Sequence, residues 1–393
     1  MKKETLVTTL GTASEIHPNP YRGAVNMPVY RASTILFNSL AEFEAADNGK
    51  CAYPTYGRFG TPSTEALEMA IATLEGADYS IVTASGLSAI ACSMLAFLNA
   101  GDHLLMVDSV YGPTRRLCDG EFKRLGIETT YYDPCIGAGI ADLIRENTKV
   151  IFTEIVGSLS FEVQDIPAIS AAAHARGVVV VSDNTWATPF YINPFELGVD
   201  VSVHSATKYI AGHSDLVMGV LSCRGDEHYK KLLRTFRNFG ARASGDECYL
   251  ALRGLRTMAV RLKQHAESGL RVANWLEKRP EVAEVLHPAL PSFAGHDIWK
   301  RDFSGATSLF SIVLKDGYSH DALAAMVDGL EHFGMGYSWG GFESLLITCH
   351  LDKIRTATKW ERKGFVVRLH IGLENADDLI ADLEAGFARL VAN

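Results

Sequence analysis

Apolar residues occur along the chain in short continuous runs, and from Ser63 onward these runs alternate with stretches of helical period. A run without polar interruptions is typical of a strand that is buried on both faces. Strands that alternate with helices predict an α/β domain built on a mostly parallel sheet. The runs are 80–83, 103–107, 150–153, 178–181 and 201–203, and the clearest helical stretches are Thr64–Leu74 and Ala168–Ala175.

The alternation of apolar runs and helical stretches is lost toward both ends of the chain. The first 60 residues are irregular and are interrupted by prolines, which break periodicity. Toward the C-terminus, a long helical stretch at Leu255–Lys278 is followed by a short strand at Leu309–Leu314 and a final helix at Ala376–Ala392. We therefore predict three parts: an extended N-terminal segment over 1–60, a large domain over 61–254 and a smaller α/β domain over 255–393.

Length, charge and cysteine usage narrow the class of protein. A chain of 393 residues exceeds one ordinary core, which agrees with more than one domain. The net charge of −9 argues against general nucleic-acid binding. The seven cysteines are scattered and none has C-x-x-C spacing, which predicts reduced thiols in a cytoplasmic protein and no metal site. No run approaches the ~18 apolar residues of a membrane helix, and no apolar leader opens the chain, so we expect no membrane association.

The surroundings of Lys208 are the strongest local signal for chemistry. This lysine follows the apolar run 201–203, within Ser205-Ala206-Thr207-Lys208-Tyr209. Burial at a strand end would lower the pKa of the amine, which favours a Schiff base with a carbonyl group. The preceding hydroxyl side chains could donate to a phosphate. The alternative is a strand-end lysine that reaches solvent.

Two other strand ends carry residues suited to a bound ring or anion. The run 178–181 leads to Asp183, at the edge where open α/β sheets bind ligands. A carboxylate there could pair with a protonated pyridine nitrogen. The segment Thr83–Ser88 passes through Gly86 into a predicted helix, whose N-terminal N–H groups favour phosphate. The alternatives are an aspartate that caps a turn and an ordinary helix start.

These motifs together resemble those of the Cys/Met metabolism family of enzymes, which use pyridoxal 5′-phosphate (PLP). The resemblance extends over nearly the whole chain, and the combination of motifs is highly specific. It is carried by Tyr56-Gly57-Arg58, by Asp183-Asn184-Thr185-Trp186, by the Lys208 motif with Gly212-His213-Ser214-Asp215, by Gly254-Leu255-Arg256-Thr257 and by Arg368-Leu369-His370-Ile371-Gly372-Leu373-Glu374.

The resemblance implies an α/β fold of PLP fold type I, like that of aspartate aminotransferase, with a large mostly parallel sheet domain and a smaller C-terminal α/β domain. It also implies a homotetramer, a dimer of dimers with shared active sites, in which residues 1–60 contact the partner subunit. In catalysis, Lys208 would hold PLP, Asp183 would bind the pyridine nitrogen and Tyr111 would stack on the ring. The phosphate would meet Gly86, Leu87, Ser205 and Thr207, with Tyr56 and Arg58 of the neighbouring subunit, and the substrate would meet Ser158, Tyr337, Ser338, Trp339 and Arg368.

Within the family, the chain is most similar to bacterial members that cleave cystathionine at its β-carbon, notably over 287–291, 299–303 and 337–345. This implies α,β-elimination of L-cystathionine to homocysteine, pyruvate and ammonia, a step of methionine biosynthesis, with other cysteine S-conjugates as further substrates. The alternatives are γ-elimination or γ-replacement by a related enzyme, and a non-catalytic PLP-binding protein. One departure is Glu154-Ile155-Val156-Gly157-Ser158, where family members commonly read Glu-Ser-Pro. Loss of the proline could move the loop that carries Ser158.

Overall fold

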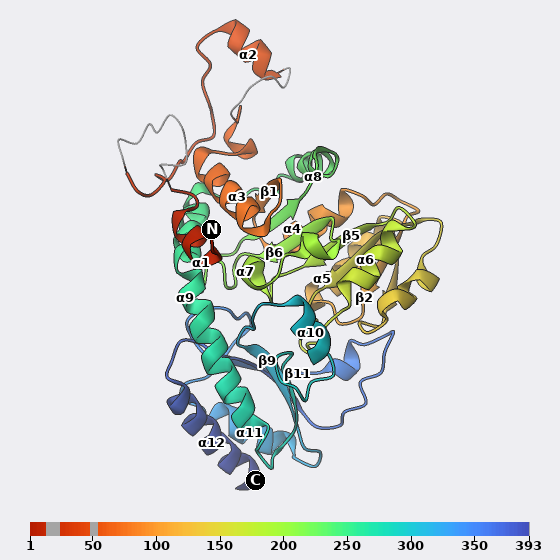
Figure 1. Cartoon of the computed structure of the whole chain (residues 1–393), viewed down its shortest axis with the longest axis vertical. Helices are drawn as coiled ribbons and strands as arrows, with labels where there is room; N and C mark the ends of the chain where they lie inside the picture. Colours follow the sequence, from red (N-terminus) through yellow and green to blue (C-terminus); the bar gives the residue numbers. More distant parts are fainter. Residues whose placement is uncertain (13–23, 48–53, 393) are drawn as a thin grey trace.

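Two β-sheets, placed one beyond the other along the long axis, form the body of the molecule (Figure 1). The computed structural model describes residues 1–12, 24–47 and 54–392. Helix α9 (Gly245–Leu276, 32 residues) runs beside both sheets (Figure 1). One continuous helix therefore connects the part of the chain that forms the large sheet with the part that forms the small one.

The large sheet has seven strands in the order β1-β7-β6-β5-β4-β2-β3. Neighbouring strands are parallel except at β7, which is antiparallel to both β1 and β6. The predicted mostly parallel sheet is thus confirmed. Its strands are β1 (Tyr79–Thr83), β2 (His103–Val107), β3 (Glu128–Tyr132), β4 (Thr148–Glu154), β5 (Val179–Asp183), β6 (Val201–Ser205) and β7 (Gly219–Cys223).

Apolar cores cover both faces of this sheet. Consecutive residues of β1 point to opposite faces, so Ile81 joins one core and Val82 the other. Polar side chains set where the covering helices begin: Ser85 accepts from the N–H of Ser88 at 3.0 Å at the start of α4. The helices are α3 (Pro62–Glu75), α4 (Gly86–Leu95), α5 (Gly112–Leu117), α6 (Ile166–His174), α7 (Thr188–Tyr191) and α8 (Asp226–Phe239), with short helical segments at Gly57–Phe59, Cys118–Phe122, Gly137–Leu143 and Pro194–Leu197.

The small sheet has the order β10-β11-β12-β9-β8 and is mostly antiparallel. Helices α9 and α12 pack on it through a separate core that includes Leu276, Phe310, Leu369 and Phe387. Its strands are β8 (Val282–Leu286), β9 (Leu309–Leu314), β10 (Gly334–Met335), β11 (Leu345–Cys349) and β12 (Val366–His370), and its helices are α10 (His296–Asp302), α11 (His320–Asp328) and α12 (Ala376–Ala392), with one turn at Leu351–Lys353.

The predicted start of the long helix at Leu255 is wrong, because α9 begins ten residues earlier, at Gly245. Ser244 and Glu247 form a capping box there: Glu247 N–H donates to Ser244 Oγ at 3.2 Å, and Ser244 N–H donates to the Glu247 carboxylate at 2.8 Å. The predicted domain boundary at 254/255 therefore falls inside α9, and the division into domains stays a prediction.

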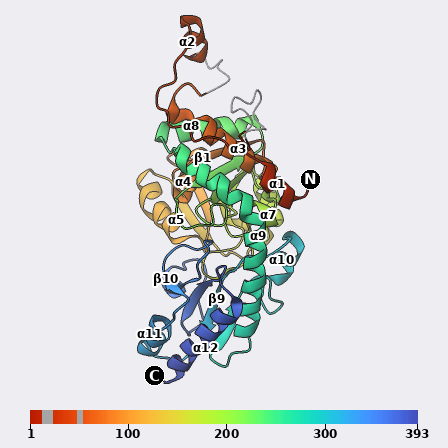
Figure 2. The same cartoon turned by 90° about the vertical axis from the view of Figure 1, so that its left-hand side faces the viewer.

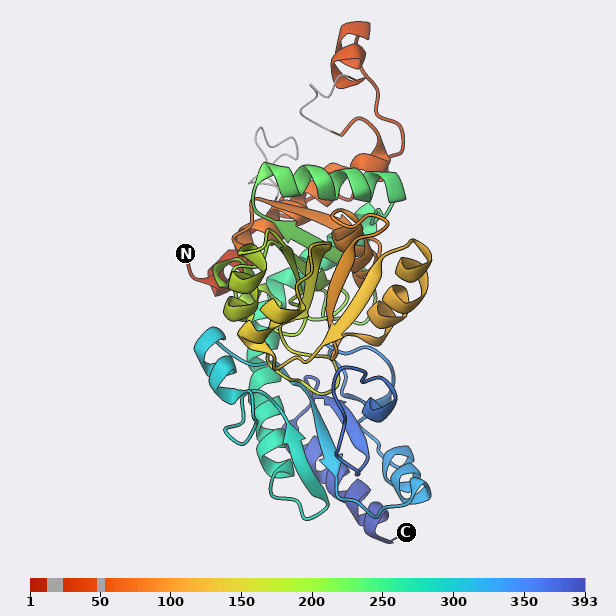
Figure 3. The same cartoon turned by 90° about the vertical axis from the view of Figure 1, so that its right-hand side faces the viewer.

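The N-terminal segment extends away from the body. Helix α1 (Lys3–Thr9) packs on α9, whereas α2 (Leu40–Asp47) projects beyond the rest of the chain, as Figure 2 and Figure 3 show from two sides. Leu40 and Phe43 on this projection are 70% and 52% exposed. The contact of residues 1–60 with a partner subunit stays a prediction, and parts of that segment lie outside the described residues.

The described residues restrict where chemistry can occur. Over 1–12, 24–47 and 54–392, no helix is long and apolar enough to cross a membrane, and no group of three or more His, Cys, Asp or Glu side chains could hold a metal ion. Six cysteines are free, and Cys51 lies outside the described residues.

Candidate active site

Lys208 follows β6 and contacts the C-terminal part of the chain. Its amine donates to Ser338 Oγ at 2.6 Å. Burial lowers the pKa of the Lys208 amine to about 8, with the charge of Arg368 acting in the same direction and that of Asp183 opposing it. An amine with this pKa is partly neutral near pH 7. The geometry therefore favours a reactive lysine over one that merely reaches solvent.

Asp183 ends β5 and lies in register with Glu154, the last residue of β4. Its carboxylate accepts from the N–H of Thr185 at 2.8 Å. Burial raises the pKa of Asp183, while hydrogen bonds from Thr185 and the positive charge of Lys208 lower it. A largely desolvated carboxylate of this kind gains from a cationic partner, which a protonated pyridine nitrogen would supply.

The start of α4 approaches the end of β6 closely. A Cβ added at Gly86 would lie 2.8 Å from the Cβ of Ser205, so a side chain there would force the two segments apart. Gly86 and Leu87 belong to the first turn of α4, where N–H groups have no partner within the helix and attract phosphate. Thr207 follows Ser205 and bonds Met218, donating to its carbonyl at 3.2 Å and accepting from its N–H at 2.9 Å. The structure thus brings Gly86 and Ser205 together, while the Thr207 hydroxyl bonds Met218, and the phosphate site stays a prediction.

Arg368 lies on β12 of the small sheet and bonds Ser338, the residue that Lys208 also contacts. Its Nη2 donates to the carbonyl of Ser338 at 2.8 Å. Its Nε is buried and has no hydrogen-bond partner among the described residues. Burial lowers the pKa of Arg368, but a guanidinium stays charged. An unused, buried guanidinium N–H is suited to an anionic ligand oxygen, such as one of a substrate carboxylate.

The two aromatic residues beside Ser338 have different positions. The ring centroid of Trp339 lies 5.3 Å from the Lys208 amine and 5.4 Å from the ring of Tyr209. Tyr337, in contrast, is 90% exposed. The structure therefore brings Trp339 to the lysine but leaves Tyr337 at the surface, and a role of Tyr337 in substrate binding stays a prediction.

Glu154 connects two loops that carry predicted site residues. One oxygen accepts from the N–H of Tyr111 at 2.6 Å, and the other accepts from the N–H of Ser158 at 2.8 Å. The Ser158 loop is therefore anchored although it lacks the proline common in the family. The sequence identifies Glu154 only as the start of a segment that departs from the family pattern and does not predict that its carboxylate anchors two loops.

Tyr56 and Arg58 lie in the N-terminal segment near α8. Arg58 donates to the carbonyl of Arg237 at 2.7 Å, and its guanidinium lies 4.5 Å from the ring centroid of Phe59. Tyr56 is 43% exposed. Their predicted role at the phosphate of a neighbouring subunit stays a prediction.

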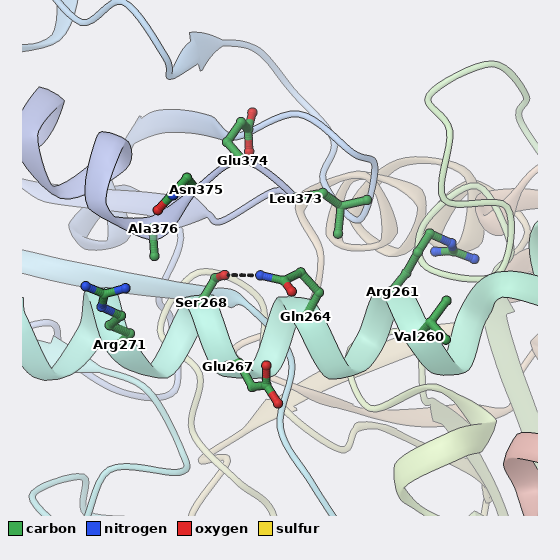
Figure 4. Close-up of a pocket in the computed structure, with 10 residues that line it drawn as sticks. All are labelled: Val260, Arg261, Gln264, Glu267, Ser268, Arg271, Leu373, Glu374, Asn375 and Ala376. Atoms are coloured by element: carbon green, nitrogen blue, oxygen red, sulfur yellow. Dashed lines mark hydrogen bonds between the residues drawn. The ribbon is translucent and has the colours of Figure 1, made fainter.

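A groove of about 620 Å³ lies apart from these residues, between α9 and the segment that leads into α12 (Figure 4). On its α9 wall, Gln264 donates to Ser268 at 2.8 Å. Glu374 and Asn375 form the facing wall (Figure 4). None of the predicted site residues is among the residues that line this groove.

The donor set around Lys208 fits PLP. Lys208 supplies an amine of lowered pKa, and Asp183 supplies a carboxylate suited to a pyridine nitrogen. Gly86 has no side chain, which leaves the N-terminus of α4 accessible to a phosphate. Asp183 and Lys208 come from the ends of the neighbouring strands β5 and β6, whereas the start of α4 follows β1, which β7 separates from β6. Fold and site together define an α/β enzyme that uses PLP.

Comparisons with known proteins identify the family. The model of the Cys/Met metabolism PLP-dependent enzymes matches residues 8–388. The chain is 52% identical over 374 residues to a putative cystathionine beta-lyase of Rhizobium johnstonii, with 94% of this chain and 93% of the relative covered. It is 43% identical over 375 residues to cystathionine beta-lyase MetC of Escherichia coli, with 94% and 95% covered. The crystal structure of metB from Corynebacterium glutamicum matches with a TM-score of 0.90 at 31% identity, covering 99% and 98%.

The chain therefore belongs to the Cys/Met metabolism family of PLP-dependent enzymes. The predicted fold type I and the predicted PLP cofactor are confirmed.

Proposed function

We propose that this enzyme is a carbon–sulfur lyase that cleaves L-cystathionine by α,β-elimination to homocysteine, pyruvate and ammonia. The observation that carries the proposal is the Lys208 amine, with a pKa of about 8, held 2.6 Å from Ser338 Oγ. The names of the relatives at 52% and 43% identity support the choice of cystathionine as substrate. Cysteine S-conjugates that share its Cβ–S bond would be further substrates.

The cofactor would be held from three sides. Lys208 would bind its aldehyde carbon, Asp183 its pyridine nitrogen, and Tyr111 would cover the ring. When bound, PLP supplies an electron sink for the negative charge that develops at the substrate α-carbon. Its phosphate would lie at the start of α4, against Gly86, Leu87, Ser205 and Thr207.

Lys208 is the residue placed to move protons. Once free of the cofactor, its amine would remove the proton from the substrate α-carbon, a role that its pKa of about 8 suits near neutral pH. The hydrogen bond to Ser338 Oγ orients the amine. The resulting ammonium would return the proton to the sulfur as the Cβ–S bond breaks and homocysteine leaves. Hydrolysis of the three-carbon remainder gives pyruvate and ammonia.

Two groups would bind the substrate carboxylate. The unused Nε of Arg368 offers one charge-assisted bond, and Ser158, anchored by Glu154, offers another. Trp339 would narrow the pocket beside the lysine, since its ring lies 5.3 Å from the amine. A narrow, rigid wall supports β-elimination, because γ-chemistry needs a second proton removal and more room for the side chain.

Purified enzyme with PLP and cystathionine is expected to give pyruvate as its main keto acid. Only β-elimination produces pyruvate, whereas γ-elimination at the same substrate produces 2-oxobutyrate. Chromatographic identification of both keto acids, with cystine and a homoserine ester as parallel substrates, distinguishes the alternatives. Mainly 2-oxobutyrate would assign the enzyme to the γ-acting group, and no turnover on any substrate would favour a PLP-binding protein without catalysis.

The proposal includes a cytoplasmic homotetramer in methionine biosynthesis, with active sites shared between subunits. Support comes from the projecting N-terminal segment, whose Leu40 and Phe43 are exposed and line a hollow of about 470 Å³ together with Tyr56. Burial of such apolar side chains in a subunit contact would be favourable. In that assembly Tyr56 and Arg58 would reach the phosphate of the partner's cofactor.

Replacing Arg58 with alanine is expected to weaken PLP binding by roughly 10- to 100-fold, because an Arg–phosphate bond contributes about 1.5–3 kcal/mol. Equilibrium dialysis or fluorescence titration of cofactor-free protein measures the effect. Arg31→Ala is the matched control, since Arg31 lies in the same segment and forms an exposed ion pair with Asp246. Equal PLP affinity in both variants, or full activity in a monomer, would contradict the shared site.

A further inference from the structure

The turn that carries Ser338 and Trp339 packs on the backbone of Lys208. Ser338 has a φ of +82° and Gly340 a φ of +84°, both in the left-handed region. A Cβ added at Gly340 would lie 3.0 Å from the carbonyl carbon of Lys208 and 2.9 Å from the N of Tyr209. Any shift of this turn would therefore displace the Ser338 hydroxyl and the Trp339 ring relative to the lysine.

Two side chains of β12 hold the turn in place. Arg368 Nη2 donates to the carbonyl of Ser338 at 2.8 Å, and the N–H of Gly340 donates to His370 Nε2 at 3.1 Å. Residues 368 and 370 share a face of the strand because side chains alternate along it, and they meet residues that are also two apart in the turn. Left-handed backbone is unfavourable for serine, so the turn depends on such contacts from outside.

The His370 ring is fully buried. Burial lowers the pKa of His370 well below its ordinary value, His265, Arg368 and Lys208 act in the same direction, and the contact with the Gly341 carbonyl opposes them. The ring is therefore neutral near pH 7. A neutral imidazole has one nitrogen that donates and one that accepts. The position of its single proton therefore decides which contacts the ring can make.

Its neighbours indicate that the proton lies on Nδ1. This nitrogen lies 3.3 Å from Ser308 Oγ, which also lies 3.2 Å from Nδ1 of His265 and has two lone pairs with which to accept from both rings. Nε2 is then left with a lone pair and accepts from Gly340 N–H. The carbonyl of Gly341 also lies 3.2 Å from Nε2, but it could bond only to a protonated Nε2, which would leave the Gly340 N–H without its acceptor.

We infer that His370 is a positioning residue: by accepting from Gly340 N–H it fixes the turn at residues 338–340, and through it the Ser338 hydroxyl and the Trp339 ring, against Lys208. His370 does not itself touch the reacting atoms. The kinetic part of this inference rests on the proposed lyase function, whereas its structural part does not.

Two polar substitutions of His370 distinguish the contribution of Nε2 from that of Nδ1. In His370→Gln, the side-chain oxygen can occupy the position of Nε2 and still accept from Gly340. In His370→Asn, the shorter side chain reaches only the position of Nδ1 and can bond Ser308 but not Gly340. Each variant keeps one of the two contacts. Melting temperature and PLP content establish that both are folded and loaded.

Hydrogen exchange of a peptide covering 337–342, followed by mass spectrometry, reports the turn directly. His370→Asn is expected to speed this exchange roughly tenfold, while His370→Gln keeps it near the wild-type rate. We expect kcat/KM for cystathionine to fall about 10- to 100-fold in the Asn variant, through misplacement of the hydroxyl and ring, and to fall less than about threefold in the Gln variant.

The outcomes are distinguishable. Equal exchange in the two variants, or faster exchange in the Gln variant alone, would overturn the assigned hydrogen bond. Faster exchange in the Asn variant with unchanged kcat/KM would show that the bond exists but does not position the reaction, which also overturns the inference. If the wild-type enzyme does not cleave cystathionine, the proposed function fails, and the exchange rates still decide the structural part.

Discussion

Replacing Lys208 with alanine is expected to lower pyruvate formation from cystathionine by about 10³-fold or more. A positioned general base alone contributes about 10²- to 10⁴-fold, and this lysine is also the proposed attachment point of the cofactor. Two measurements test this: turnover per folded subunit, and the mass of the protein after borohydride reduction. The reduced wild-type chain should retain covalently bound cofactor, and the reduced variant should not.

Lys3→Ala is the matched control for removal of a desolvated lysine. Burial also lowers the pKa of the Lys3 amine, which donates to the carbonyls of Pro189 and Phe190 at 2.7 and 3.0 Å. Lys3 lies outside the proposed site, so its loss should leave turnover per folded subunit nearly unchanged. Wild-type turnover in the Lys208 variant, or an equal loss in both variants, would remove Lys208 from the proposed mechanism.

Measurements of the free energy of unfolding show whether a Lys208 variant loses activity because the reaction fails or because the protein unfolds. The pKa of Lys208 is lowered from 10.5 in the unfolded chain to about 8 in the fold, so the unfolded state binds more protons between these values. The contribution of Lys208 to stability therefore rises with pH across this window, and the lysine destabilises the cofactor-free fold below pH 8. Lys208→Met should raise the free energy of unfolding at pH 7 by about 1–3 kcal/mol, allowing for partial solvent screening, and the difference should shrink toward pH 10.5.

The architecture of the large domain follows from local sequence. Uninterrupted apolar runs predict its buried strands, and the strand ends deliver Lys208 and Asp183 to one edge of the sheet. The true start of α9 is marked by the capping residues Ser244 and Glu247 rather than by the hydrophobic period, which becomes clear only from Leu255 onward.

The residues that the sequence did not reveal act through contacts between distant segments. Glu154 bonds backbone N–H groups 43 positions before it and 4 after it. His370 bonds the N–H of a residue 30 positions away. Every residue except proline carries a backbone N–H, so the sequence does not indicate which N–H group a given side chain bonds. The sequence also does not show which residues of a turn face the site. Ser338 and Trp339 lie close to Lys208, whereas their neighbour Tyr337 is exposed.

Asp183→Asn should lower kcat by about 10²- to 10³-fold. Asparagine can still accept from the N–H of Thr185, which Asp183 bonds at 2.8 Å, so the local backbone is expected to persist. What is lost is the negative charge proposed to hold the pyridine nitrogen protonated. Removing one partner of a buried charged pair costs about 3–5 kcal/mol, of which most would appear in the rate because the electron sink weakens. Steady-state kinetics and the absorbance spectrum of the bound cofactor measure the change.

Glu154→Gln is the control for a carboxyl group lost from the neighbouring strand. Burial and the negative charge of Asp183 raise the pKa of Glu154 to about 8, so near pH 7 this substitution removes hydrogen-bonding capacity rather than charge. Glu154 lies in register with Asp183 on the next strand, and each substitution removes one carboxylate from the same pair of strands. Glutamine can offer an oxygen to only one of the two N–H groups, those of Tyr111 and Ser158, that Glu154 bonds. We therefore expect this variant to raise KM for cystathionine by about tenfold through the Ser158 loop, with the cofactor spectrum nearly unchanged. If both variants alter the spectrum and kcat alike, the loss of either carboxyl group disturbs the site in the same way, and Asp183 has no specific role at the pyridine nitrogen.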